Sequence, residues 1–260
     1  LAEVCNQTKF EITAGGIEAG EVALHALNVC SDKAARTLIR NGDFVYCYNA
    51  NAQTGENEYK LVAYLGNAVT LTLPTDYRGQ SYDIFNGAFM GNDSLREAYL
   101  PDGLKEIDDL AFSGCKSLIS VSLPDTLTEI GNNAFYDCWG LKQLTVPASV
   151  ERIGSQAFYN CAQLSTVNFE DGDVPLEIGD SAFRECMSLA AVNFPDRLKS
   201  LAPRAFLGAG LSSVYLPSGV EYLTGEAGAR EYFDRASLMH FIFKTRDAYL
   251  AGLENESLAA

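Results

Sequence analysis

The sequence has no run of 18 apolar residues, so no stretch of it is suited to cross a bilayer as a helix. It also lacks a signal peptide and begins with Leu1 rather than methionine, so we expect a mature form or an excised piece of a longer protein. Basic residues are scarce: 19 lysines and arginines stand against 34 aspartates and glutamates, which gives a net charge of −15. This balance argues against nucleic acid and anionic membranes as partners, since both attract clustered basic residues.

Groups that support catalysis or metal binding are also scarce. The two histidines, His25 and His240, lie near opposite ends of the chain. No glycine-rich stretch ends in the Gly-Lys-Ser/Thr of a phosphate loop, and no Cys-x-x-Cys pair marks a zinc site. We therefore expect no catalytic residue, no metal site and no cofactor, and we predict that the protein is not an enzyme.

What the sequence does have is a repeat, marked by an Ala-Phe pair. The phenylalanines of these pairs, at positions 89, 112, 135, 158, 183 and 206, are 23, 23, 23, 25 and 23 residues apart. An isoleucine or leucine lies four residues before each alanine, and a cysteine lies three residues after most of the phenylalanines. A fixed period near 23 residues predicts a solenoid, in which each repeat packs only against its neighbours.

The repeat resembles the BspA-like leucine-rich repeat family. The stretch Leu123–Pro147 reads LPDTLTEIGNNAFYDCWGLKQLTVP and carries the pattern LPxxLxxIxxxAFxxCxxLxxVxLP. The resemblance covers residues 81–220 closely and the flanks loosely. It implies one right-handed coil per repeat, a bacterial protein at the cell surface or secreted, and a role in adhesion and protein binding.

Each repeat is expected to contain one strand and one helical turn. In Ser117–Pro124, Leu118, Val121 and Leu123 should face inward, and the proline should end the strand. The stretch after it buries residues at spacings of three, four, one and three, which favour a turn of α- or 3₁₀-helix; in the central repeat these are Leu127, Ile130, Ala134, Phe135 and Cys138. The predicted fold class is therefore an α/β repeat: a right-handed leucine-rich-repeat solenoid with strands on one face and short helical turns on the other.

The flanks depart from the repeat, and four regions result. Residues 1–29 are expected to form a degenerate repeat, 30–80 a hairpin insert and the first strand, 81–220 the regular repeats, and 221–260 a degenerate repeat and C-terminal cap. Alternating, aromatic-rich runs at 43–49 and 59–65 predict the β-hairpin. Either more repeats precede residue 1, or the hairpin region caps the array.

Several local features carry further expectations. We expect a first strand at 69–73, a last strand at 237–243, and a short capping helix at 245–253. The extra residues of the 25-residue repeat, EDGDVP at 170–175, should form a solvated surface bulge rather than a calcium loop. Four of the seven cysteines share one column, and we expect buried, reduced thiols, because parallel in-register side chains point the same way and disulfide geometry is poor; these are Cys115, Cys138, Cys161 and Cys186.

Two surfaces are candidate binding sites. The outward strand positions are short, polar and nearly uncharged, which suits an extended protein partner, although short side chains also let coils curve; the candidate residues are Tyr99, Ser122, Thr145, Ser165, Asn168, Asn193 and Tyr215. The second surface comprises Tyr136, Trp139 and Tyr159, which either stack on sugar rings or on a partner's apolar side chains, or cover the edge of the core.

The sequence therefore predicts a non-enzymatic extracellular binding or adhesion solenoid that recognises protein partners on host or bacterial surfaces. One alternative is a carbohydrate-binding module that uses the aromatic surface. Another is a structural spacer within a larger surface protein. The expected location is the cell surface or the secreted fraction.

Overall fold

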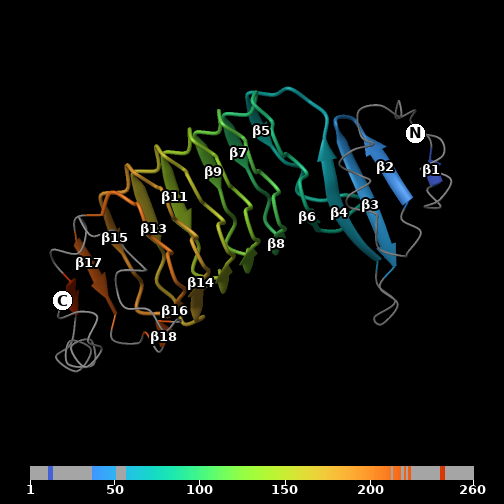
Figure 1. Ribbon diagram of the computed structural model, residues 1–260. Coiled ribbons are helices and arrows are strands. Elements are labelled where there is room, and N and C mark those ends of the chain that lie inside the picture. The colour runs from blue at the N-terminus through green and yellow to red at the C-terminus, as the bar shows by residue number, and fades with distance from the viewer. Residues whose placement is uncertain are drawn as a thin grey trace.

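The computed structural model describes residues 11–13, 37–50, 57–211, 213–217, 220, 222–223 and 241–243. In these residues the chain winds as a solenoid whose coils lie side by side in one row (Figure 1). Each regular coil contributes one strand to each of two parallel sheets and then closes through a run of turns. The solenoid predicted from the period of 23 residues is thus confirmed.

The first sheet carries the strands that were predicted from the sequence. Its strands are β5 (Thr70–Thr72), β7 (Glu97–Tyr99), β9 (Ser120–Ser122), β11 (Gln143–Val146), β13 (Thr166–Phe169), β15 (Ala191–Asn193), β17 (Ser213–Leu216) and β19 (Phe241–Phe243). β5–β9 form one ladder and β11–β19 another, and the Lys142 amide donates to the Ile119 carbonyl at 3.0 Å across the junction. The outward side of this sheet is termed the strand face.

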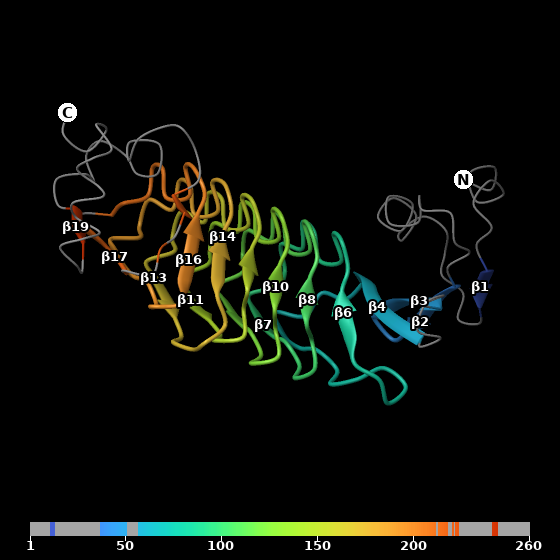
Figure 2. The ribbon, with the colours of Figure 1, turned by 90° about the horizontal axis from the view of Figure 1, so that it is seen from below.

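A second sheet lies on the side where helical turns were predicted (Figure 2). In spatial order its strands are β1 (Glu11–Thr13), β2 (Thr37–Asn41), β3 (Phe44–Ala50), β4 (Asn57–Tyr64), β6 (Tyr82–Ile84), β8 (Glu106–Ile107), β10 (Glu129–Ile130), β12 (Arg152–Ile153), β14 (Leu176–Ile178), β16 (Leu198–Leu201) and β18 (Tyr222–Leu223). In the regular coils these strands are short, and each points its isoleucine or leucine into the core.

The prediction of short helical turns is wrong: the residues that the structure describes contain no helix. In the central coil Asn133 and Asp137 have φ of 55° and 57°, and the equivalent residues of the next coil, Gln156 and Asn160, have φ of 56° and 55°. A left-handed residue at every fourth position interrupts any right-handed helix. The buried residues recur at spacings of three and four because consecutive tight turns have nearly the same period as a helix.

Backbone hydrogen bonds explain how these turns replace a helix. Ala134, Tyr136 and Cys138 donate within their own coil, to the carbonyls three residues earlier, at 3.1–3.4 Å. The alternate amides, those of Asn133, Phe135 and Asp137, instead donate to carbonyls of the next coil at 2.7–2.9 Å. This alternation satisfies buried backbone groups, and it ties each coil to the following one along a third side, termed the turn wall.

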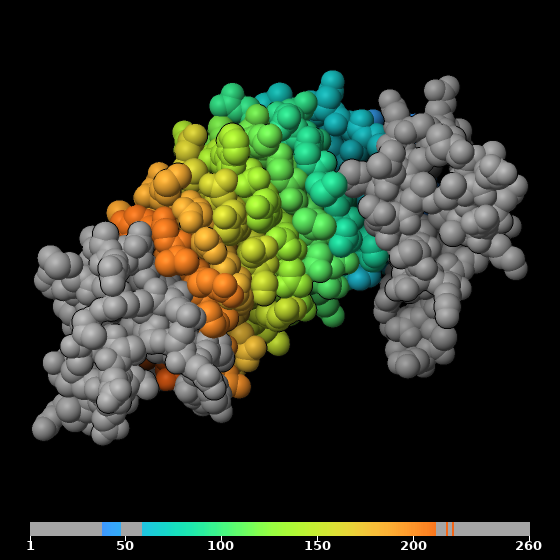
Figure 3. Space-filling view, viewed as in Figure 1, coloured from blue at the N-terminus to red at the C-terminus, as the bar shows by residue number. Residues whose placement is uncertain are grey.

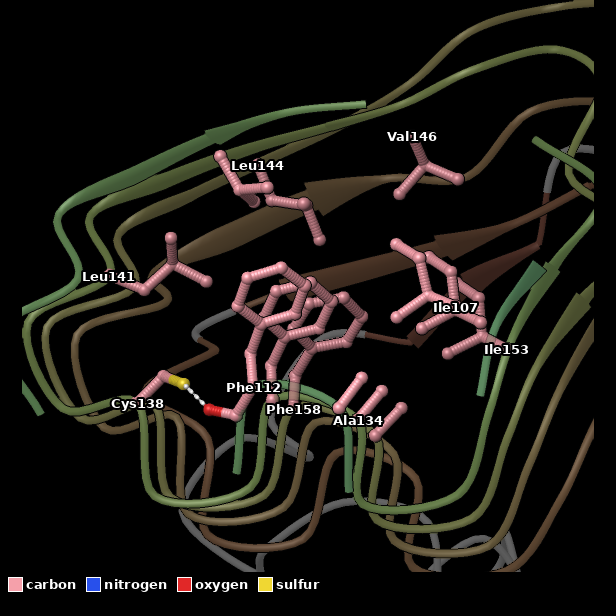
Figure 4. Close-up of a cluster of buried hydrophobic side chains, with 14 of the residues drawn as sticks. Ile107, Phe112, Ala134, Cys138, Leu141, Leu144, Val146, Ile153 and Phe158 are labelled. Carbon is pink, nitrogen blue, oxygen red and sulfur yellow. Dashed lines mark hydrogen bonds between the residues drawn. The ribbon is translucent and has the colours of Figure 1, made fainter. Parts of the chain in front are cut away.

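The core is a continuous stack of side chains from equivalent positions (Figure 4). The Phe89, Phe112, Phe135, Phe158, Phe183 and Phe206 rings stack in order, with centroids 4.6–5.1 Å apart and planes within 8° of parallel. Leu127, Ile130, Ala134, Phe135 and Cys138 are fully buried, as predicted. The phenylalanine column therefore forms the spine of the core.

The predicted hairpin is present, and it continues the solenoid rather than standing apart from it. β3 and β4 pair antiparallel, with Ala50 opposite Asn57, and β2 adds a further antiparallel strand. β4 also pairs in parallel with β6 of the array. The Tyr64 ring lies 5.5 Å from that of Phe89, so the hairpin extends the aromatic spine. The described part of the hairpin thus supports the alternative in which this region covers the end of the regular array.

Some sequence predictions fall on other residues. β5 lies within the predicted first strand at 69–73, and β19 lies within the predicted last strand at 237–243. Apart from β1, the degenerate repeat at 1–29 lies outside the described residues, as does the capping helix at 245–253.

The column of thiols is buried and reduced. Cys115, Cys138, Cys161 and Cys186 are free, and each Sγ donates to the carbonyl of a phenylalanine of the preceding coil at 3.1–3.3 Å. Burial raises the pKa of Cys115 and of Cys186 to about 12, and the pKa values of the two central thiols also lie well above their ordinary value.

Native protein is therefore expected to alkylate these four cysteines slowly at pH 8, and unfolded protein rapidly, since only the thiolate reacts. Mass spectrometry after timed alkylation resolves each site separately. The unfolded thiols lose protons above pH of about 9 while the folded ones keep theirs, so the free energy of unfolding should fall as the pH rises further. Rapid native labelling of Cys138 would contradict this burial.

One buried arginine holds the irregular 25-residue repeat. Arg197 is only 8% exposed, and its guanidinium donates to the carbonyls of Pro147 and Val150 in one coil and of Glu170 and Val174 in the next, at 2.6–3.3 Å. Burial lowers the pKa of Arg197. The intervening residues 171–173 are exposed, as expected for a surface bulge. Arg197 thus fixes the bulge to the solenoid from beneath.

Candidate functional site

The strand face brings most of the predicted binding residues into one row. Tyr99 lies beside Ser122 in register, and Thr145, Asn168, Asn193 and Tyr215 follow one another in the second ladder. Parallel pairing in register fixes this row, because each residue occupies the same place in its repeat. The side chains from Tyr99 to Asn193 are exposed, and that of Tyr215 lies outside the described residues.

Ser165 lies at the edge of this row, just before β13. Its side chain is exposed, and its hydroxyl donates to the Lys142 carbonyl of the preceding coil at 3.2 Å. The hydroxyl therefore helps to hold neighbouring coils together, and is less available to a partner than those of Ser122 and Thr145.

The strand face is uncharged across its centre. From β9 to β15 the outward side chains are serine, threonine, glutamine, asparagine and alanine; they belong to Ser120, Ser122, Gln143, Thr145, Thr166, Asn168, Ala191 and Asn193. The second sheet contrasts with it, because its outward row includes Glu106, Glu129, Arg152 and Glu177. Glu129 pairs with Arg152, and Glu106 pairs with Lys60 at 3.3 Å. Charge is therefore segregated between the two sheets.

The predicted aromatic residues also lie together, on the turn wall. The Tyr136 and Tyr159 rings stack with centroids 4.9 Å apart and planes at 5°. Both are half-buried, and burial, followed by the Asp137 carboxylate and Tyr159, raises the pKa of Tyr136. The two tyrosines thus cover the edge of the core, as one of the two alternatives held.

Trp139 differs from the tyrosines because it is 45% exposed. The Lys116 ammonium lies 5.3 Å from its ring centroid, and the indole N–H donates to Asp137 at 3.4 Å. The Arg184 guanidinium lies 5.8 Å from the Tyr159 ring, so a cation flanks the aromatic group at each end. Lys116 and Arg184 were not predicted as site residues, and only alignment of repeat positions identifies them.

Among the described residues, no group of three or more histidine, cysteine, aspartate or glutamate side chains is placed to hold a metal ion. His25 and His240 lie outside the described residues. Nor does any helix in the described ranges have the length and apolarity to span a membrane. The two surfaces above are therefore the candidate sites.

Comparisons with known proteins agree with this fold. The model of the BspA type leucine rich repeat region matches six copies over residues 82–174 and 172–230. A leucine-rich repeat protein from T. pallidum is 30% identical, with 69% of this chain and 83% of that chain covered and a TM-score of 0.58. A leucine rich cell surface protein from Faecalibacterium prausnitzii is 25% identical, with 73% of this chain and 50% of that chain covered and a TM-score of 0.46.

No protein with a curated description matches the chain. The family match nevertheless covers more than half of the sequence, and it falls on the coils whose phenylalanine and cysteine columns form the core. The chain therefore belongs to the family of BspA-type leucine-rich repeat proteins.

Proposed function

We propose that the chain is a non-enzymatic extracellular recognition module that binds a protein partner on a host or bacterial surface through its strand face. The observation that carries this proposal is the uncharged row from Ser120 to Asn193 in a chain of net charge −15. Side chains without charge lose less hydration energy when a partner covers them, and the centres of protein interfaces are depleted of charged residues.

The ends of the row add to this support. Tyr99 is 45% exposed at the N-terminal end, and Tyr215 occupies the same row at the other end. Tyrosine is enriched among the residues that contribute most to protein–protein affinity. The face between them is built on in-register strands, so its side chains hold fixed positions for a partner. A location at the cell surface or in the secreted fraction agrees with membership of the BspA-type family.

The double variant Asn168→Arg/Asn193→Arg should weaken binding of the partner by about tenfold or more, because covering an unpaired charge costs at least about 1–3 kcal/mol. Both side chains are exposed, so the melting temperature should stay unchanged. The partner is first captured from surface proteins of host cells and bacteria, and its affinity for each variant is then measured by surface plasmon resonance. Affinity for the native protein should depend little on salt.

The matched control is Thr128→Arg/Ser200→Arg, which adds the same charge to the second sheet. It should leave the affinity unchanged. Equal weakening by both double variants would assign the effect to overall charge. Binding that survives the strand-face arginines but is lost at high salt would place the site on the acidic surfaces and refute the proposal.

A further inference from the structure

A notch on the turn wall lies beside the only tryptophan of the chain. The residues that directly follow the cysteine column are Lys116, Trp139, Ala162 and Met187, one from each of four successive coils. The Gln163 amide donates to the Trp139 carbonyl at 3.2 Å, which places the Trp139 and Ala162 turns side by side. Met187 is 61% exposed and Trp139 45% exposed, whereas the alanine between them ends at its Cβ. A large side chain therefore stands on each side of a small one (Figure 3).

The two sides of the notch are an indole and a thioether. The Lys116 ammonium lies over the Trp139 ring from the preceding coil, so the opposite face of the indole is the one that is turned toward Ala162. Met187 supplies an unbranched, polarizable side chain from the coil beyond. Stacked Tyr136 and Tyr159 form the adjoining surface. The notch is thus apolar on two opposed sides and closed behind by aromatic rings.

Its width suits one ring. Neighbouring coils lie about 5 Å apart, as the 4.9 Å between Tyr136 and Tyr159 shows, so the Trp139 and Met187 positions are separated by about 10 Å. A ring inserted between two apolar groups needs about 7–8 Å, which is twice the carbon–carbon contact distance of about 3.5–4.0 Å. One ring fits between the two side chains, and two do not.

Polar groups border the notch in a way that suits a neutral ligand. The Asn160 amide donates to Asp137 Oδ1 at 2.7 Å, which leaves Asn160 Oδ1 and Asp137 Oδ2 to accept hydrogen bonds. The nearby charges nearly cancel, since Lys116 and Arg184 are balanced by Asp137 and Glu185, and Arg184 lies 3.6 Å from Glu185. A ring that donates hydroxyl hydrogens and carries no charge matches these acceptors.

We infer that the Trp139–Ala162–Met187 notch is a binding subsite for one neutral pyranose ring of a β-linked glycan. The apolar face of a pyranose with equatorial hydroxyls stacks on the free face of Trp139, as sugar C–H groups do on aromatic rings. Its hydroxyls donate to Asp137 and Asn160. This inference does not rest on the strand face, so protein binding there and sugar binding here can fail separately.

Because Trp139 is the only tryptophan of the chain, intrinsic tryptophan fluorescence reports directly on the site. The full chain is titrated with β-1,4-linked trimers of glucose and of N-acetylglucosamine, and with heparin as an anionic comparison. At least one neutral trimer should give a saturable change in emission in the millimolar range or below, and heparin should give none. The strand-face variant Asn168→Arg/Asn193→Arg should bind the trimer with unchanged affinity.

Ala162→Leu fills the notch and keeps the tryptophan, so it should raise the Kd for the trimer by about tenfold or more. Lys116→Ala, which alters the opposite face of the indole, should leave the Kd within about twofold. Thermal melts check that both variants remain folded. No saturable change with either neutral trimer, saturation by heparin alone, or unchanged affinity in folded Ala162→Leu would each overturn the inference.

Discussion

Phe135→Ala is expected to lower the free energy of unfolding by about 3–5 kcal/mol. Phe135 is fully buried, and its ring stacks on Phe112 at 5.0 Å and on Phe158 at 5.1 Å. The substitution removes the burial of an aromatic ring and leaves a cavity in the middle of the spine. The neighbouring rings cannot close that cavity, since backbone hydrogen bonds of both sheets and the turn wall fix the distance between coils.

The loss should also divide the array. Each coil contacts only its neighbours, so stability is transmitted through interfaces between adjacent coils. Weakening two consecutive interfaces separates the coils before Phe135 from those after it, and urea unfolding followed by hydrogen exchange should show the two parts opening at different denaturant concentrations. Thr145→Ala, an exposed change on the same coil, should alter stability by no more than about 0.5 kcal/mol. Similar curves for both variants would contradict the role of the spine.

Arg197→Met should destabilise the protein by about 3 kcal/mol or more, because it leaves buried carbonyls without their charged donor and hydrogen bonds from charged groups contribute about 1.5–3 kcal/mol each. The four acceptors belong to two coils and to the bulge at 170–175. Methionine fills a similar volume, so the effect is one of hydrogen bonding rather than of a cavity.

Arg197→Lys serves as the matched control, because it keeps the charge but cannot reach all four carbonyls with a single ammonium. It should be destabilised by an intermediate amount. Hydrogen exchange should be accelerated mainly around residues 170–176 in both variants. Uniform exchange across the array, or a melt of Arg197→Met that matches the native protein, would contradict the proposed attachment of the bulge.

The solenoid and its buried columns could be predicted because a repeat constrains every copy at once. Ala134, Phe135 and Cys138 recur at fixed positions, and only stacked coils bury all of them together. The alternation around Val121 likewise predicted which side chains of β9 face solvent. The row of the strand face followed from the same register, so most of its residues were identified before the structure.

The turn wall could not be predicted from spacing, since helices and linked turns bury residues at nearly the same intervals. The informative signal lay in composition. The positions at and around Asp137 hold Gly91, Gly114, Asn160 and Gly208 in other coils, and these residue types accept positive φ. Gly154 adds a second signal, because a Cβ there would lie 2.6 Å from a backbone carbon of Gly131. A helix does not need glycine at that point.

The role of Arg197 and of the notch also escaped sequence reasoning, for different reasons. An arginine after Pro195-Asp196 resembles an exposed turn residue, and its carbonyl partners lie as far as 50 residues earlier in the chain. Ala162 and Met187 are unremarkable individually, and become informative only when their coils are placed beside that of Trp139.

The hydrogen bonds of the turn wall give the solenoid an electrical direction. The peptide unit that joins Ala134 to Phe135 accepts from Phe112 of the preceding coil and donates to Ala157 of the following one. Equivalent units repeat from coil to coil, so peptide dipoles align head to tail along the long axis, as they do in an α-helix. Their sense is reversed relative to a helix, with carbonyls toward the N-terminal coils and N–H groups toward the C-terminal coils. An anionic group is therefore favoured at the C-terminal end of this wall, and a cation at the N-terminal end.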